Sequence, residues 1–81
     1  MEVAEIKLKI EQALSGAHVE VRDLTGGGDH FEALVVSTEF EGRSLVERHQ
    51  TVYRALGDAM RQQVHALSLK TLTPSQYQRG R

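Results

Sequence analysis

Apolar side chains at the start of the chain recur every three to four residues. That spacing puts them on one face of a helix and predicts a helix over residues 2–14. Gly16 follows this stretch and can adopt the left-handed conformation that ends many helices. The apolar positions of the predicted face are Val3, Ile6, Ile10, Ala13 and Leu14.

Two segments after this helix have the pattern of strands. Residues 19–22 alternate between apolar and polar side chains, which predicts a first strand, and residues 31–38 predict a second. The centre of the second strand, residues 33–36, is apolar at both parities, which indicates that both of its faces are covered. Three successive glycines between the strands require a loop, so the pair is predicted to be an antiparallel hairpin. We expect the loop, residues 25–30, to be among the most mobile parts of the free protein.

A second amphipathic helix is predicted from Ser44 onward. Ser44 and Glu47 have the spacing of a capping box, in which each side chain bonds a backbone N–H at the start of the helix. The helix should run to about Gln62, although Gly57 weakens it by ~1 kcal/mol relative to alanine. Its apolar stripe contains Leu45, His49, Val52, Tyr53, Leu56 and Met60. The side chains expected to pack both helices on one face of the sheet are Ile6, Ile10, Leu45, Val52 and Leu56.

The remaining pattern predicts a third strand and a short last helix. Residues 64–71 have the pattern of a strand, and residues 73–76 carry Pro74 at the first helical position, where its missing N–H costs nothing. The order α-β-β-α-β-α predicts a single α+β domain over residues 1–81 with a three-stranded mixed sheet. The third strand should be parallel to one of the first two, because the helix from Ser44 supplies the long connection that parallel strands require.

Composition narrows the classes of function. A chain of 81 residues forms one small domain, in which a deep catalytic cleft would remove core that the fold needs. The formal net charge of −1 gives no general attraction to nucleic acid or to an anionic membrane. No apolar run approaches the ~20 residues of a membrane span and the first residues lack a signal-peptide pattern, so we expect a cytoplasmic protein without membrane contact. No catalytic motif is visible, so we expect no enzymatic activity.

Metal binding would depend on histidines and carboxylates, because the sequence has no cysteine. Neutral imidazole is a common ligand of iron and zinc. His30 is the last residue of the glycine loop, and His65 is near the start of the predicted third strand. His18 is expected at the surface and His49 on the apolar stripe of the middle helix. Spacing alone favours ordinary surface or packing roles for all of them.

Two longer motifs resemble those of the BolA family. Residues 40–50, FEGRSLVERHQ, are similar to the central signature of BolA proteins, and residues 64–74, VHALSLKTLTP, are similar to the family's second motif. Residues 29–31 match the hairpin region of the family. The resemblance covers nearly the whole chain, and it implies a fold like the type II KH domain.

The resemblance also implies a partner and a cofactor. BolA proteins bind monothiol glutaredoxins, and the pair can share a [2Fe–2S] cluster to which the glutaredoxin gives a cysteine and a bound glutathione gives a second thiolate. The family's motif histidine is His65 here, and the loop position that holds cysteine or histidine in the family is His30. The resemblance therefore implies that His65 and His30 are metal ligands in the complex. It also implies that the isolated chain holds no cluster and is a monomer or weak homodimer, and that the protein acts in iron–sulfur trafficking or in iron, redox or stress regulation.

Nucleic-acid binding is the alternative that a KH-like fold leaves open. The candidate contacts to DNA lie along the middle helix and are Arg43, Arg48 and Arg54. Against this reading, the chain lacks the G-x-x-G loop with which KH domains clamp a nucleic-acid backbone. The arginines are also interleaved with Glu47 and Asp58, as on an ordinary solvated helix face.

Overall fold

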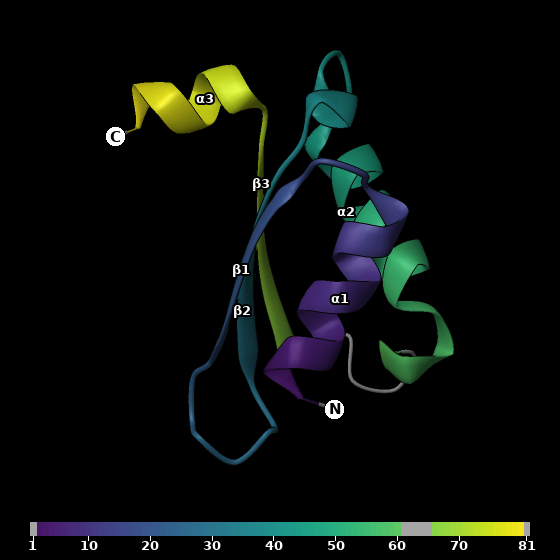
Figure 1. Ribbon diagram of the computed structural model, residues 1–81, viewed down its shortest axis with the longest axis vertical. Helices are drawn as coiled ribbons and strands as arrows, with labels where there is room; N and C mark the ends of the chain where they lie inside the picture. Colours follow the sequence, from purple (N-terminus) through teal and green to yellow (C-terminus); the bar gives the residue numbers. More distant parts are fainter. Residues whose placement is uncertain (1, 61–65, 81) are drawn as a thin grey trace.

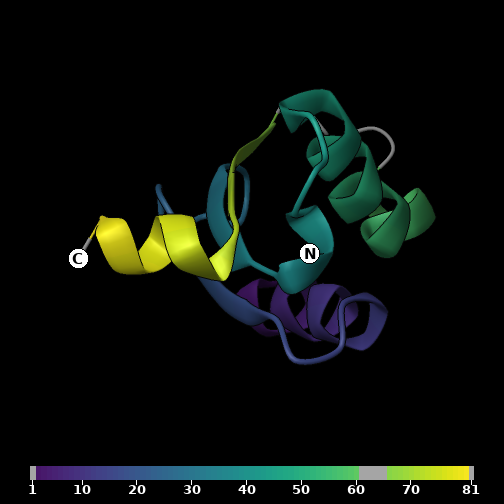
Figure 2. The ribbon, with the colours of Figure 1, turned by 90° about the horizontal axis from the view of Figure 1, so that it is seen from above.

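A computed structural model describes residues 2–60 and 66–80 of the chain. Helices α1 and α2 pack against one face of a three-stranded sheet, and a short helix, α3, projects from one end of the sheet (Figures 1 and 2). This arrangement confirms the predicted α+β class and the α-β-β-α-β-α order. No helix in the described ranges is long and apolar enough to cross a membrane. The elements are α1 (Val3–Ala13), β1 (His18–Asp23), β2 (Phe31–Val36), η1 (Thr38–Phe40), α2 (Leu45–Leu56), η2 (Gly57–Met60), β3 (Leu67–Leu72) and α3 (Pro74–Arg79).

The central strand of the sheet is β2. It pairs antiparallel with β1 and parallel with β3, as predicted from the length of the connections. Phe31, the first residue of β2, pairs with Leu67, the first residue of β3, so both strands start at the same end of the sheet. Because parallel strands require a long connection, the chain between them crosses one face of the sheet through α2 and η2.

The core lies between the sheet and the two long helices. The buried side chains from the predicted helix faces are Ile6, Ile10, Val52 and Leu56, each 0–1% exposed. The prediction for Leu45 was wrong, because its side chain is 62% exposed. Leu45 is the first residue of α2, and the fully buried ring of Phe40 from η1 joins the core just before that helix begins. The apolar stripe of the sequence therefore begins before the buried face of α2, whose buried residues are Val52 and Leu56.

The second face of the sheet is largely open to solvent, so the prediction that both faces of β2 are covered is confirmed only at the end of the strand, where Val36 is buried. Ala33 and Val35 are fully buried in the core, whereas Leu34 between them is half-buried and points to the other side. The strand register places Glu20 and Lys70 on either side of Leu34. The short α3 lies at one end of the sheet and does not extend across this face (Figure 1). The apolar run of β2 therefore puts Ala33 and Val35 into the core, whereas on the other face Leu34 is half-buried between charged neighbours and Val36 is buried.

The middle helix ends earlier than predicted. The last residue of α2 is Leu56, and Gly57 has φ 61° and ψ −148°, a conformation essentially restricted to glycine. The chain continues as the short helix η2, so Gly57 ends the α-helix instead of only weakening it. Residues 61 and 62 of the predicted helix lie outside the described residues. The same holds for residues 64 and 65 of the predicted third strand, which is observed over Leu67–Leu72.

Replacing Gly57 tests this helix end. Gly57→Ala should lower the free energy of unfolding by about 1–3 kcal/mol, because a β-carbon disfavours its backbone conformation even though the surrounding space is open. Gly80→Ala is the matched control, since Gly80 has φ −83° and an added β-carbon would meet only ordinary contacts at 3.6 and 3.7 Å. Denaturant unfolding followed by circular dichroism measures both variants. Equal losses would contradict the role assigned to Gly57.

Candidate functional site

One candidate metal ligand, His30, lies at the end of the sheet at which β2 and β3 start. His30 directly precedes Phe31, the first residue of β2, and its side chain is exposed. Leu67, the first residue of β3, is the neighbour of Phe31 across the parallel pair. His65 is two positions before Leu67 in the sequence and lies outside the described residues. The structure therefore places His30 beside the start of β3, and the pairing of the two histidines stays a prediction.

The carboxylate of Asp23 organises the glycine loop that precedes His30. It accepts hydrogen bonds from the backbone N–H groups of Thr25 at 3.2 Å, Gly26 at 2.9 Å and Gly28 at 2.9 Å. The backbone N–H of Leu24 donates to the carbonyl of His30 at 2.8 Å and closes the loop. Sequence reasoning missed Asp23, although an aspartate before a Thr-Gly pair is a recognised turn signal. The expected mobility of the loop stays a prediction.

A second carboxylate within the loop, that of Asp29, has its pKa lowered. The main cause is the Thr25 hydroxyl, which donates a hydrogen bond to the carboxylate, with smaller contributions from nearby backbone N–H groups and from the charge of His30. A lowered pKa means that this contact stabilises the folded state above the pKa of the unfolded chain. The stabilisation is lost as the pH falls through the folded pKa, so acid should loosen the loop that carries His30.

The loop assignment predicts the effect of removing Asp23. Asp23→Ala should cost about 1 kcal/mol and should speed amide hydrogen exchange at residues 25, 26 and 28, because their N–H groups lose a shared acceptor. Asp23→Asn keeps one acceptor oxygen and should have an intermediate effect. Hydrogen exchange followed by NMR measures each amide separately. Unchanged exchange in Asp23→Ala would show that the glycines hold the loop without this carboxylate.

Arg48 is held inside the fold and does not form one surface with the other candidate nucleic-acid contacts. Its Nε donates to the Arg43 carbonyl at 3.1 Å, and its Nη1 donates to the Thr71 carbonyl at 3.3 Å and to Gln76 Oε1 at 3.0 Å. Its guanidinium carbon also lies 5.8 Å from the centre of the Phe40 ring. One half-buried side chain thus connects α2 to β3 and to the start of α3. A helical pattern does not reveal contacts over such sequence distances.

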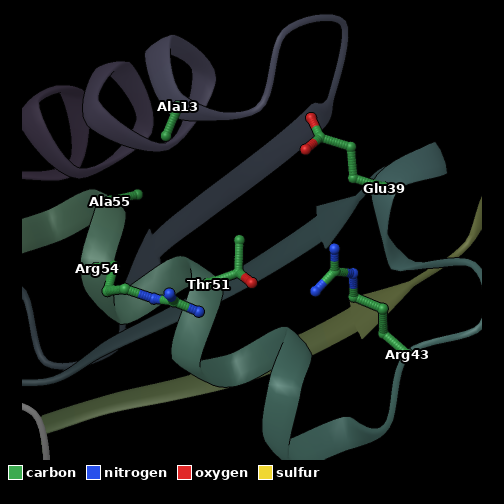
Figure 3. A pocket seen from close by; sticks show the side chains of 6 residues that line it. All are labelled: Ala13, Glu39, Arg43, Thr51, Arg54 and Ala55. Atoms are coloured by element: carbon green, nitrogen blue, oxygen red, sulfur yellow. The ribbon is translucent and has the colours of Figure 1, made fainter.

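Arg43 and Arg54 lie instead at a hollow between the C-terminal end of α1, η1 and α2. Figure 3 shows their side chains extending toward one another across this hollow, with Thr51 between them. Its volume is about 390 Å³. The residues that line it are Ala13, Glu39, Arg43, Thr51, Arg54 and Ala55. The three predicted arginines therefore separate into one that stabilises the fold and two that face a pocket.

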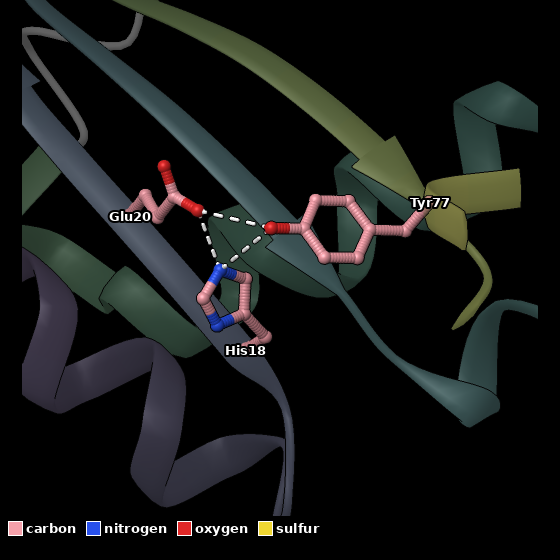
Figure 4. Close-up of polar contacts among 3 residues, drawn as sticks. All are labelled: His18, Glu20 and Tyr77. Atoms are coloured by element: carbon pink, nitrogen blue, oxygen red, sulfur yellow. Dashed lines mark hydrogen bonds and ion pairs between the residues drawn. The ribbon is translucent and has the colours of Figure 1, made fainter. Parts of the chain in front are cut away.

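A polar cluster on the open face of the sheet connects α3 to β1. His18 Nε2 lies 2.5 Å from Glu20 Oε2, and the Tyr77 hydroxyl lies 3.4 Å from both atoms (Figure 4). The rings of His18 and Tyr77 are 5.3 Å apart between centroids. His18 is exposed, as predicted, and its contacts fit a structural role.

His49 is half-buried on α2, in agreement with its place on the apolar stripe. Its Nε2 atom is buried and has no hydrogen-bond partner among the described residues. Within residues 2–60 and 66–80, no three histidine or acidic side chains lie close enough to hold a metal ion together. A metal site that used this part of the chain would therefore need ligands from elsewhere.

Removing Arg48 should destabilise the protein. Arg48→Ala should lower the free energy of unfolding by about 1–3 kcal/mol, since it leaves the Thr71 carbonyl and the Gln76 amide without this donor. Arg48→Lys should recover only part of the loss, because an ammonium group lacks the planar fork that reaches several acceptors. Arg54→Ala is the control and should change stability by less than about 0.5 kcal/mol, as expected for an exposed surface position. Similar stability of Arg48→Ala and Arg54→Ala would contradict the assignment.

The described fold agrees with solved structures of one class of protein, the BolA-like proteins. The structure of a bolA protein homologue from Coxiella burnetii matches with a TM-score of 0.80 at 43% identity, over 96% of this chain and 97% of that chain. A family model described as "BolA-like protein" matches residues 2–76. The chain therefore belongs to the BolA-like family, as its motifs predicted.

Two further relatives show how this domain occurs in other chains. BolA-like protein 1 from Mus musculus is 41% identical over 91% of this chain, and the match spans 59% of the length of the mouse protein. The BolA domain of SufE1 from Arabidopsis thaliana matches with a TM-score of 0.76 at 35% identity, over 90% of this chain and 92% of that chain. The same domain is thus found in longer proteins as well as in short chains.

Proposed function

We propose that this protein binds a monothiol glutaredoxin, shares a [2Fe–2S] cluster with it, and acts in iron–sulfur trafficking or in iron and redox regulation without being an enzyme. The proposal rests on membership of the BolA-like family. The observation that carries it further is the position of His30, which is exposed at the start of β2, directly beside the start of β3. The second proposed ligand is His65, which the family motif supplies.

The ligands of this chain fit a cluster shared between two proteins. The sequence contains no cysteine, so it offers the cluster imidazole and no thiolate. Two histidines leave the two irons short of ligands, and the thiolates of a partner cysteine and of glutathione would complete the set. When bound, the cluster would supply redox and transfer chemistry, and imidazole in place of thiolate raises its potential by reducing negative charge. The isolated chain should accordingly bind the cluster poorly.

The occurrence of a BolA domain within SufE1 is consistent with a role in iron–sulfur chemistry. Nucleic-acid binding has weaker support. Arg48 donates hydrogen bonds to the Thr71 carbonyl and to Gln76 within the fold. The negative charge of Glu39 lies at the same pocket as Arg43 and Arg54. A cytoplasmic location remains part of the proposal.

Histidine variants test the proposal in the complex. The full chain is reconstituted anaerobically with a monothiol glutaredoxin, glutathione, iron and sulfide, and the absorption and circular-dichroism spectra of the cluster are recorded. His65→Ala should abolish or strongly alter the spectrum. His30→Ala should have a milder effect, because a ligand on a glycine-rich loop loses more conformational entropy when it binds.

His18→Ala is the matched control, since His18 already contacts Glu20 and Tyr77 and belongs to neither proposed ligand position. Its cluster spectrum should equal that of the unchanged protein. A normal spectrum for His65→Ala would refute the ligand assignment. Failure of the two proteins to co-elute in size-exclusion chromatography would refute the partner.

A further inference from the structure

The hollow between α1 and α2 exists because small side chains meet there. Ala13 near the end of α1 and Ala55 near the end of α2 both line it, and neither has atoms beyond the β-carbon to fill it. Its volume of about 390 Å³ lies within the range of ~300–1,000 Å³ that is typical of small-molecule sites. The hollow lies on a different part of the molecule from the sheet end that carries His30.

Both arginines at this hollow extend from ordered backbone. The Arg43 N–H donates to the Phe40 carbonyl at 3.1 Å, and the Arg43 carbonyl accepts from Arg48, so this residue is held on both sides. Arg54 is three residues after Thr51 on α2, which puts both on one face of the helix. Nε of Arg54 has only a long contact, 3.4 Å, to the Gln50 carbonyl. The fold therefore sets the direction in which each side chain leaves the backbone.

Neither guanidinium forms an ion pair within the described part of the chain, although Arg43 has one charged neighbour: the pKa of Glu47, lowered mainly by hydrogen bonds with Ser44, is also lowered by the charge of Arg43. The ion pairs found there are His18 with Glu20 and Arg22 with Glu32, and neither involves Arg43 or Arg54. Glu39 lines the same hollow but forms no ion pair with either guanidinium. Two cations that face one another repel, and an anion between them would turn this repulsion into attraction.

We propose that this pocket binds the phosphate monoester group of a small molecule. Guanidinium groups match phosphate oxygens with paired N–H donors, and two of them on opposite sides can hold one phosphate. The Glu39 carboxylate would repel a second negative group of the ligand. It can accept a hydrogen bond from a hydroxyl or ammonium group next to the ester. This combination favours a compact phosphorylated metabolite over a long polyanion such as nucleic acid.

The test is an NMR titration of the isolated protein with inorganic phosphate and with O-phosphoserine, which carries an ammonium group. Both should shift the amide signals of residues 43, 51 and 54 in a saturable manner, and phosphoserine should bind more tightly. Arg43→Gln and Arg54→Gln should each weaken binding about tenfold, as expected for the loss of a charge-assisted hydrogen bond. Lys70→Gln removes the same charge from the open face of the sheet and should leave binding unchanged. Melting curves show that each variant is folded.

Three results would overturn the proposal. One is the absence of saturation up to about 50 mM phosphate, which corresponds to negligible affinity. Another is an equal loss in Lys70→Gln, which would indicate attraction to net charge alone. The third is the binding of single-stranded DNA through Arg43 and Arg54 with a steep salt dependence. In that case about 50 mM phosphate, added at constant ionic strength, would fail to compete with the DNA. The assay contains neither iron nor glutaredoxin, so its result is independent of the proposed cluster function.

Discussion

The parallel pairing of β2 with β3 is the constraint on which the rest of the structure depends. It requires the chain to return across one face of the sheet, and α2 and η2 make that return (Figure 1). The same crossing buries Val52 and Leu56 against the sheet and leaves the opposite face open. It also brings the starts of both strands to one end, where His30 lies. Topology thus sets the core and the candidate cluster site together.

The regular elements could be predicted from the sequence because their signals are local. The periodicity of residues 2–14 predicted α1, and the Ser44–Glu47 capping box is present in both directions, with Ser44 Oγ accepting from the Glu47 N–H at 3.2 Å and Glu47 Oε1 accepting from the Ser44 N–H at 2.9 Å. Leu45 was misplaced because a helical repeat gives the direction of a side chain but not where the core ends. For Gly57, the average helix propensity predicted only a weaker helix, whereas the backbone conformation of this residue ends the helix.

The candidate sites were predictable in part. Sequence spacing alone gave His30 and His65 no special status, and the resemblance to BolA proteins supplied their proposed role. Arg48 was grouped with neighbours on its helix, but its acceptors Thr71 and Gln76 are 23 and 28 residues away. Contacts over such distances depend on how the elements pack, so no local pattern contains them. The same holds for the hollow between Ala13 and Ala55.

Arg48 has a further consequence for the free edge of the sheet. The Leu72 carbonyl accepts from the Ser37 N–H at 3.1 Å, so the preceding carbonyl, that of Thr71, points away from β2 toward the outer edge of β3. Arg48 donates to this carbonyl. An edge strand with a free acceptor is a template for pairing with a strand of another chain, which leads to aggregation. Because the acceptor near the end of β3 is already occupied by a charged side chain, a foreign strand would have to displace it, and this part of the edge resists the addition of a fourth strand.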